Sequence, residues 1–351
     1  MALTSAEYQE LVQSISGRKP WYVNAAAASD AGDGKCPSQA KKTIAAGVAL
    51  CSPGDALFLT GQFTDQLNLS SSTDLVVDGG NWNTQISDAG SPNYDNPISM
   101  GTRCLVKNLA AIQSSPSSAE SGTNTTPCGI FINSVDQAVL ENVYVISNCQ
   151  GVTLNDSTDT QLLNVLINSG EAGISWTGST GVIRNSQIHS KDWPTCDQMA
   201  IGVNGTKTGY LEIWDSVFRS VRGGSIDANT LFTTGLYLLD GIVIAHGSSF
   251  YGYDCIADIA KTSTASGVYD GSSSSISSVN LQGCVIRGRS DIGAFYDIDG
   301  TGSGANHYYD LSTIYRTNKI SQTFPSAKLN ASSVAGYIDG KISYSGLQIQ
   351  S

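Results

Sequence analysis

The chain has 351 residues, of which only 14% are charged and 37 are glycine, and its formal net charge is −11. This balance argues against a nucleic-acid-binding protein, because phosphate neutralisation needs concentrated Lys and Arg and the 19 present form no cluster in the sequence. No apolar run approaches the length of a transmembrane helix, and the first residues, MALTSAEYQELVQ, lack the basic start and apolar core of a secretory signal.

An amphipathic helix is predicted within residues 1–20. Thr4 and Glu7 have the spacing of a capping box, and Gly17 and Pro20 end the pattern. The apolar residues that recur on one helical face are Tyr8, Leu11, Val12 and Ile15. This apolar stripe needs a surface to cover it, either on the body of the same chain or on a partner.

Residues 21–55 predict a short strand, a loop of Gly and Asp, and a helix capped by Ser38. A Pro53-Gly54 turn follows and leads into a long region of short apolar runs. A helix at this point would close the open end of a stack of strands, which otherwise exposes core residues and unpaired strand edges.

The most regular part of the chain lies between Gly129 and Trp193. Glycines at 129, 151 and 173 give a period of 22 residues (151 − 129 and 173 − 151), with three short apolar runs in each repeat. A unit of three strands without a helix cannot bury its apolar residues alone, so it must stack on its neighbours. The repeat therefore predicts an all-β solenoid, a parallel β-helix.

One polar position recurs between the second and third strand of each predicted coil. Asn at this position suits a tight turn whose side chain bonds the backbone of the next coil, so we predict a structural ladder rather than a catalytic site. The residues assigned to it are Asn108, Asn142, Asn164, Asn185, Asp215, Asp240 and Gly283.

The first strands of successive coils are predicted to line one face on the order of 30 Å long, given a spacing of ~4.8 Å between coils. The residues assigned to that face are Ile130, Val152, Ile174, Ile201, Ile226, Ile256 and Phe295. The loops before these strands become longer toward the C-terminus, and richer in charged and aromatic residues, so function is expected between Lys191 and Asp310.

Four features of residues 21–55 occur in a familiar order: a Tyr-Val strand, an Asp/Gly loop, a Thr-Ile pair in a helix and a Pro-Gly-Asp turn. The matching segments are Tyr22-Val23, Asp30 to Gly34, Thr43-Ile44 and Pro53-Gly54-Asp55. This segment resembles the N-terminal cap of the pectate-lyase-like superfamily. The resemblance implies a single-stranded right-handed parallel β-helix with an N-terminal helical cap, in which an elongated polysaccharide lies along the first-strand face or in a groove between subunits.

The predicted organisation has four parts. An N-terminal amphipathic helix covers residues 1–20, a cap covers 21–55, the β-helix covers 56–320, and a C-terminal cap or assembly tail covers 321–351.

The motifs of one enzyme family, the polygalacturonases, are matched only partly, because Ala245-His246-Gly247 stands where Gly-His-Gly is needed and no Asp-Asp pair occurs. No single enzyme family is therefore indicated.

The eight cysteines permit a fully paired set of disulfides. Sequential pairing is the simplest prediction, and the alternative is that several are buried thiols stacked inside the coils. They stand at positions 36, 51, 104, 128, 149, 196, 255 and 284.

Carboxylates beside arginines on successive C-terminal coils form the candidate active site. Asp227 and Asp258 are predicted to supply the base, and Arg222 and Arg289 to clamp an acidic sugar. The alternative is that these charges form surface ion pairs, which is the commoner role of such pairs. Further residues predicted to bind substrate are Arg219, Arg287, Asp297, Asp299, His246, Trp193, Tyr251 and Tyr253.

No metal site is predicted, since the three histidines lack ligand spacing and no compact carboxylate cluster marks a Ca²⁺ site. Carboxylates from separate coils could still converge on Ca²⁺, so the cofactor is left open. Two interpretations of function remain. The first is a polysaccharide-binding or polysaccharide-degrading protein of the lyase or hydrolase kind, located outside a cell or on a virion as a tailspike component. The second is a non-enzymatic virion or surface protein that uses the β-helix as a rigid scaffold within a homo-oligomer or larger assembly.

Overall fold

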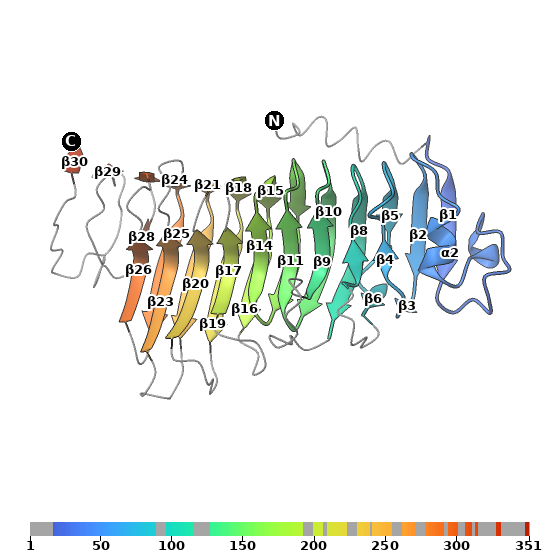
Figure 1. Ribbon diagram of the computed structural model, residues 1–351, viewed down its shortest axis with the longest axis horizontal. Helices are drawn as coiled ribbons and strands as arrows, with labels where there is room; N and C mark the ends of the chain where they lie inside the picture. Colours follow the sequence, from blue (N-terminus) through green and yellow to red (C-terminus); the bar gives the residue numbers. More distant parts are fainter. Residues whose placement is uncertain are drawn as a thin grey trace.

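The computed structural model describes residues 17–88, 96–114, 127–191, 199–205, 209–222, 230–238, 241–254, 262–270, 278–290, 294–300, 306–310, 313–314, 328–330 and 348–350. Short strands stack side by side along the long axis of the molecule (Figure 1). Every strand pairing is parallel and joins strands from successive coils. The predicted parallel β-helix is therefore confirmed.

Each coil contributes a first strand to one sheet of nine strands. In order along the stack, this sheet contains β4 (Leu67–Asn68), β7 (Ile98–Ser99), β9 (Cys128–Asn133), β11 (Gln150–Asn155), β14 (Ala172–Thr177), β17 (Met199–Gly205), β20 (Thr230–Leu238), β23 (Thr262–Asp270) and β26 (Ala294–Gly300).

The second and third strands of the coils belong to the other sheet. Two long strands, β8 (Leu105–Gln113) and β10 (Val139–Ser147), each run through both positions. The other second strands are β1 (Pro20–Asn24), β2 (Ala56–Thr60), β5 (Val76–Asp78), β12 (Thr160–Leu163), β15 (Thr180–Arg184), β18 (Tyr210–Trp214), β21 (Ile242–His246), β24 (Ser278–Gln282), β27 (Asn306–Asp310), β29 (Lys328–Asn330) and β30 (Gln348–Gln350). The other third strands are β3 (Gln62–Phe63), β6 (Gln85–Ser87), β13 (Leu166–Ser169), β16 (Gln187–Lys191), β19 (Val217–Arg222), β22 (Ser249–Asp254), β25 (Val285–Ser290) and β28 (Thr313–Ile314).

Alternation along each strand builds one continuous apolar core inside the stack. In β19, for example, Phe218 is fully buried while Arg219 is exposed, because successive side chains point to opposite faces of a sheet. Phe218 stacks on Phe250 of the next coil with ring centroids 5.2 Å apart. The core therefore consists of rows that run along the axis of the solenoid.

The turn between the second and third strands follows the prediction closely. Asn108, Asn142, Asn164, Asn185 and Asp215 all have positive φ, between 45° and 54°, the left-handed conformation that Asn and Asp tolerate best. Their ladder differs in one respect from the prediction. The amide of Asn142 donates to Oδ1 of Asn108 at 2.7 Å, and that of Asn164 donates to Oδ1 of Asn142 at 3.2 Å, so side chains bond side chains rather than backbone.

Asp240 was wrongly assigned to this ladder. The turn of that coil falls at Gly247, between β21 and β22, with φ of 57°. A Cβ at Gly247 would lie 2.5 Å from Oδ1 of Asp215, so a larger residue here would displace that side chain. Asp240 itself lies outside the described residues.

The predicted register of the first strands fails beyond β14. Ile174 pairs with Val203 rather than Ile201, and the next first strands are β20 and β23. Ile226 and Ile256 lie outside the described residues, upstream of those strands. The error arises because the connections lengthen after Lys191, so a fixed period no longer locates each strand.

At the N-terminal end, β1 pairs with β2, and the short helix α2 (Ile44–Val48) buries Ile44. The helix is capped by Thr43, whose side chain accepts from the amide of Ala46, and not by Ser38 as predicted. Ser38 lies in the 3-10 turn η2 (Pro37–Gln39). The predicted helix of residues 4–15 lies outside the described residues, and the capping role of α2 stays a prediction.

The cysteines follow the alternative prediction where they are described. No disulfide forms among Cys36, Cys51, Cys104, Cys128, Cys149 and Cys284. Burial raises the pKa of the Cys128 thiol to about 12 and that of Cys284 to about 11. Sequential disulfides are therefore wrong for the pairs 36–51 and 104–128, while Cys196 and Cys255 lie outside the described residues.

Candidate functional site

Four third strands, β16, β19, β22 and β25, stack on the same side of the solenoid. Their pairing aligns His189, Arg219, Tyr251 and Arg287 in one row, and Lys191, Val221, Tyr253 and Arg289 in a second row. In β16, β19 and β22 the alternate residues Ile188, Phe218 and Phe250 are fully buried in the core. In β16, β19 and β22 the two rows therefore stand at the positions that alternate with the core residues, and β25 continues both rows in register.

These four strands segregate charge. They contain five cationic residues and a single carboxylate, Asp254. Four of the cationic residues stand in the two rows, and we call these four the basic strip: Lys191, Arg219, Arg287 and Arg289. Arg222 and Asp254 occupy the alternate positions of their strands. Since the whole chain carries a net charge of −11, this concentration is a local reversal of sign.

The side chains at the start of the basic strip are open to solvent. Arg219 and Lys191 are exposed, and neither forms an ion pair with a carboxylate among the residues the structure describes. The Arg219 guanidinium lies over the ring of Tyr251, 5.9 Å from its centroid. Burial lowers the pKa of His189, and the neighbouring charge of Arg219 lowers it further. Arg219 and Lys191 can therefore present positive charge to an anionic ligand.

Of the four predicted catalytic residues, Arg222 lies on β19 and Arg289 on β25. Arg222 is the last residue of β19, and in the strand register it stands next to Asp254, the last residue of β22. Asp227 and Asp258 belong to the connections that follow these two strands, and Trp193 to the connection after β16; all three lie outside the described residues. Their catalytic and binding roles remain predictions.

Asp297 and Asp299 are separated from the basic strip in the sheet pairing. They lie on β26, which belongs to the first-strand sheet, whereas Arg287 and Arg289 lie on β25 in the other sheet. The two strands follow one another in the chain, with residues 291–293 between them. The sequence predicted Arg287 and Arg289 in the loop before the strand of Asp297 and Asp299, and this is wrong, because both arginines lie on strand β25 of the other sheet.

His246 belongs to a different face from Arg219 and Tyr251. It ends the second strand β21 and stacks on Trp214 of β18, with ring centroids 4.0 Å apart. On the other side of Trp214 in the same row, Arg184 lies 5.7 Å from the indole centroid. The Trp214 ring thus lies between His246 and Arg184, so it and the His246 ring stack along the solenoid and are poorly placed to stack on a sugar.

Glu212 lies beside this aromatic row on β18. It accepts hydrogen bonds from the Tyr210 hydroxyl at 2.5 Å and from Trp214 Nε1 at 3.4 Å. Burial raises the pKa of Tyr210 to about 12, with a further contribution from Glu212. These groups are tied to one another, which indicates a structural role for the second-strand face.

A pocket that the sequence did not reveal lies near the N-terminal end. It is open, has a volume of about 500 Å³, and is lined by Tyr22, Phe58, Asp78 and Asn83 among others. Tyr22 and Phe58 stack with centroids 5.4 Å apart, and Asp78 pairs with Lys107 at 3.4 Å. No motif marked it, because its walls come from three coils and the loop after β5.

No group of three or more His, Cys, Asp or Glu that could hold a metal ion occurs in the described part of the chain. In the same part of the chain, no helix has the length and apolar character needed to cross a membrane.

Comparison with solved structures identifies the class of fold. Pectate lyase Pel9A superposes with a TM-score of 0.52 at 14% identity, covering 90% of this chain and 83% of that one. XylC in complex with xylose gives a TM-score of 0.50 at 9% identity, covering 84% of this chain and 69% of that one. The chain therefore has the pectate-lyase-like parallel β-helix fold.

Other comparisons add little. The Dettilon tailspike protein gp208 matches at 14% identity over 91% of this chain and 68% of that one, but with a TM-score of 0.48. No family model matches the sequence, and no curated protein matches it significantly. Likeness at this level defines the fold and leaves the ligand to be inferred from the residues.

Proposed function

We propose that this chain binds an acidic polysaccharide along the basic strip. The observation that supports the proposal is the charge segregation of β16, β19, β22 and β25, whose two rows hold four cationic residues and no carboxylate in an otherwise acidic chain. Arg219 and Arg287 stand two coils apart in one row, ~9.6 Å at ~4.8 Å per coil. This is close to the length of two sugar units, so the two arginines can bind alternate carboxylates of an extended chain. Such a ligand places the protein outside a cell or on a virion surface.

The two structures with TM-scores of at least 0.5 agree with a saccharide ligand, since one is named a pectate lyase and the other holds xylose. An acidic polymer is favoured over a neutral one by charge alone. Tyr251 is partly covered by Arg219, so sugar stacking on this ring is less important than ion pairing.

The test is a binding panel with matched variants. Binding of polygalacturonate and alginate is compared with binding of uncharged dextran. The test variant is Arg219→Glu/Arg287→Glu. The control variant is Lys35→Glu/Lys42→Glu, because Lys35 and Lys42 are exposed and lie before β2, away from the basic strip. Both variants change the net charge equally. We expect selective binding of the acidic polymers, weakened about 10-fold or more only by the strip variant. Equal weakening by both variants, or no binding, contradicts the proposal.

Cleavage of the bound polymer is the further step of the same proposal. Asp227 and Asp258 would act as bases and Arg222 and Arg289 would neutralise the substrate carboxylate. Incubation followed by absorbance of unsaturated products separates lyase activity from binding alone, and reducing ends report hydrolysis. Asp227→Asn should abolish any product while binding persists; product formation unchanged by Asp227→Asn and Asp258→Asn removes these residues from the mechanism.

A further inference from the structure

The outer face of the second-strand sheet carries a row of buried aliphatic side chains. Ala56, Val76, Leu105 and Val139 pair in register along four coils, and their exposed fractions are only 0–2%. We call these four residues the apolar row. Their neighbours in sequence, Leu57, Val77, Val106 and Leu140, belong to the main core, so the apolar row must face away from it.

The apolar row forms a cluster separate from the main core. Among described residues, the partly buried apolar side chains that pack against it are Phe58 and Leu163, which come from the same sheet. Aliphatic side chains on the outside of a solenoid reach such low exposure only when another element lies on them.

The row continues for two more coils, where its first residue is polar. Gln161 and Val182 occupy the next two positions and are 7% and 5% exposed. Nε2 of Gln161 is buried without a hydrogen-bond partner, and so is Nε of Arg184, two residues along β15 from Val182. Buried donors of this kind are costly unless an acceptor is supplied, which points to a covering element with polar groups at this end.

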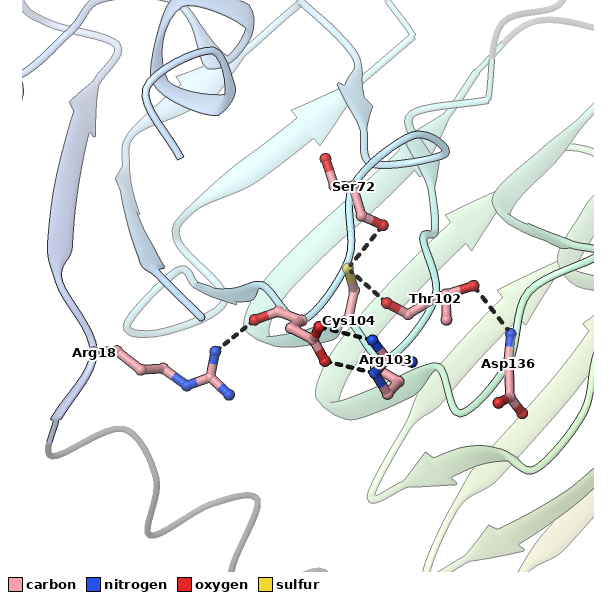
Figure 2. Close-up of polar contacts among 7 residues, drawn as sticks. Arg18, Ser72, Thr102, Arg103, Cys104 and Asp136 are labelled. Atoms are coloured by element: carbon pink, nitrogen blue, oxygen red, sulfur yellow. Dashed lines mark hydrogen bonds and ion pairs between the residues drawn. The ribbon is translucent and has the colours of Figure 1, made fainter. Parts of the chain in front are cut away.

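The chain itself enters at the near end of the row. Pro20 pairs with Ala56, so the segment before Pro20 leaves from the first position of the row. Arg18 reaches past β2 to the start of the β5 coil, where its Nη1 donates to the carbonyl oxygen of Asp74 at 2.5 Å (Figure 2). Asp74 is held in turn by a bidentate pair with Arg103, at 2.6 and 2.8 Å. Arg18 therefore ties the chain just before Pro20 to a later coil.

We propose that residues 4–15 form an amphipathic helix that docks on the apolar row of the same chain. The lengths are compatible: the apolar row from Ala56 to Val139 spans ~14 Å at ~4.8 Å per coil, and a helix of residues 4–15 spans ~18 Å. The stripe of Tyr8, Leu11, Val12 and Ile15 matches the apolar part of the row. At the far end, the Thr4 hydroxyl or a backbone carbonyl before it can accept from Gln161.

Hydrogen exchange of the full chain tests the docking directly. We expect amides of residues 5–15 to exchange at least about 10-fold more slowly than in an unstructured peptide, in monomeric protein checked by light scattering. Leu11→Asp/Val12→Asp should release this protection and raise exchange in β5, β8 and β10. The control Gln13→Asp/Ser14→Asp adds the same charge off the stripe and should leave protection intact. Exchange of residues 5–15 at unstructured rates in the parent protein overturns the proposal without reliance on any variant.

A photo-crosslinker identifies what the segment contacts. With benzophenone-alanine in place of Leu11, we expect cross-links to peptides that contain Leu105 or Val139. Mixing light and heavy isotope-labelled chains distinguishes contact within a chain from contact between chains. Cross-links only between light and heavy chains would show that a second copy covers the apolar row, and cross-links only to other peptides would show that the segment docks elsewhere; either result overturns the proposal.

Discussion

The coils from Cys128 to Lys191 and the coils from Met199 to Ser290 share one core but differ on the outside. In the first region successive coils are offset by 21 or 22 residues, and the turn ladder is made of asparagines. In the second region the offset rises to 30 between Phe218 and Ile188, and to 32 between Phe250 and Phe218, while the ladder passes to Asp215, Gly247 and Gly283.

The difference shows which parts of a coil are constrained. The buried rows stay in register however long the connections become, because each strand must bury its apolar face on the coil before it. The outer positions and the connections are free to vary, and there the second region gathers the basic strip. Stability and binding can therefore be perturbed separately, and four predictions use this separation.

The largest effect is expected in the core of the long coils. Phe218→Ala removes a fully buried ring that stacks on Phe250, and should cost ~3–5 kcal/mol of unfolding free energy through lost burial and the cavity left behind. Denaturant unfolding followed by circular dichroism measures it. Tyr251→Ala, on the outer face of the same sheet, is the control and should cost much less. Equal losses of unfolding free energy would mean that the outer face stabilises the fold as much as the core does.

In the regular coils, Asn142→Ala should cost ~2–4 kcal/mol. It forces a Cβ residue without side-chain hydrogen bonding into positive φ and removes the bonds to Asn108 and Asn164. Asn142→Gly loses the same bonds but tolerates the backbone, so it should be less destabilising than alanine by ~1 kcal/mol. Glycine and alanine variants of equal stability would show that the turn conformation carries no strain.

In the basic strip, Arg219→Ala should weaken acidic polysaccharide binding several-fold, with a change in unfolding free energy below ~0.5 kcal/mol, because the residue is exposed. Raising the salt concentration should weaken binding by the parent more steeply than binding by the variant, since one ion pair is lost. Titration calorimetry at two ionic strengths checks both points. A loss of stability that accounts for the loss of binding would assign Arg219 to the scaffold instead.

The smallest effect concerns pH. The pKa of His189 is lowered in the folded chain by burial and by Arg219, so the unfolded state binds its proton more readily. This residue's contribution to stability is therefore full above its unfolded pKa and is lost as pH falls through that value toward the lower folded pKa. His189→Gln should flatten the dependence of the melting temperature on pH between 7.5 and 5. NMR titration should show the pKa of His189 rising in Arg219→Gln; no change would exclude that charge as a cause.

Much of the scaffold was determined by the sequence alone. The 22-residue spacing of Gly129 and Gly151 and the turn residues Asn142 and Asn164 predict the β-helix, because each coil must stack and its tight turn needs a left-handed residue. Those constraints are local and periodic, so they are visible in one dimension. The apolar stripe of residues 8–15 was visible in the same way, though not the surface that it would cover.

Only the tertiary structure decided what lies beside what. Arg219 and Arg287 are 68 residues apart in sequence (287 − 219), and they share one row only because β19, β22 and β25 pair in register. The lengthened connections also hid the true first strands β20 and β23, and moved His246 to the second-strand face. A fixed period cannot predict such neighbours, since the number of residues in a connection does not affect the pairing that places the strands.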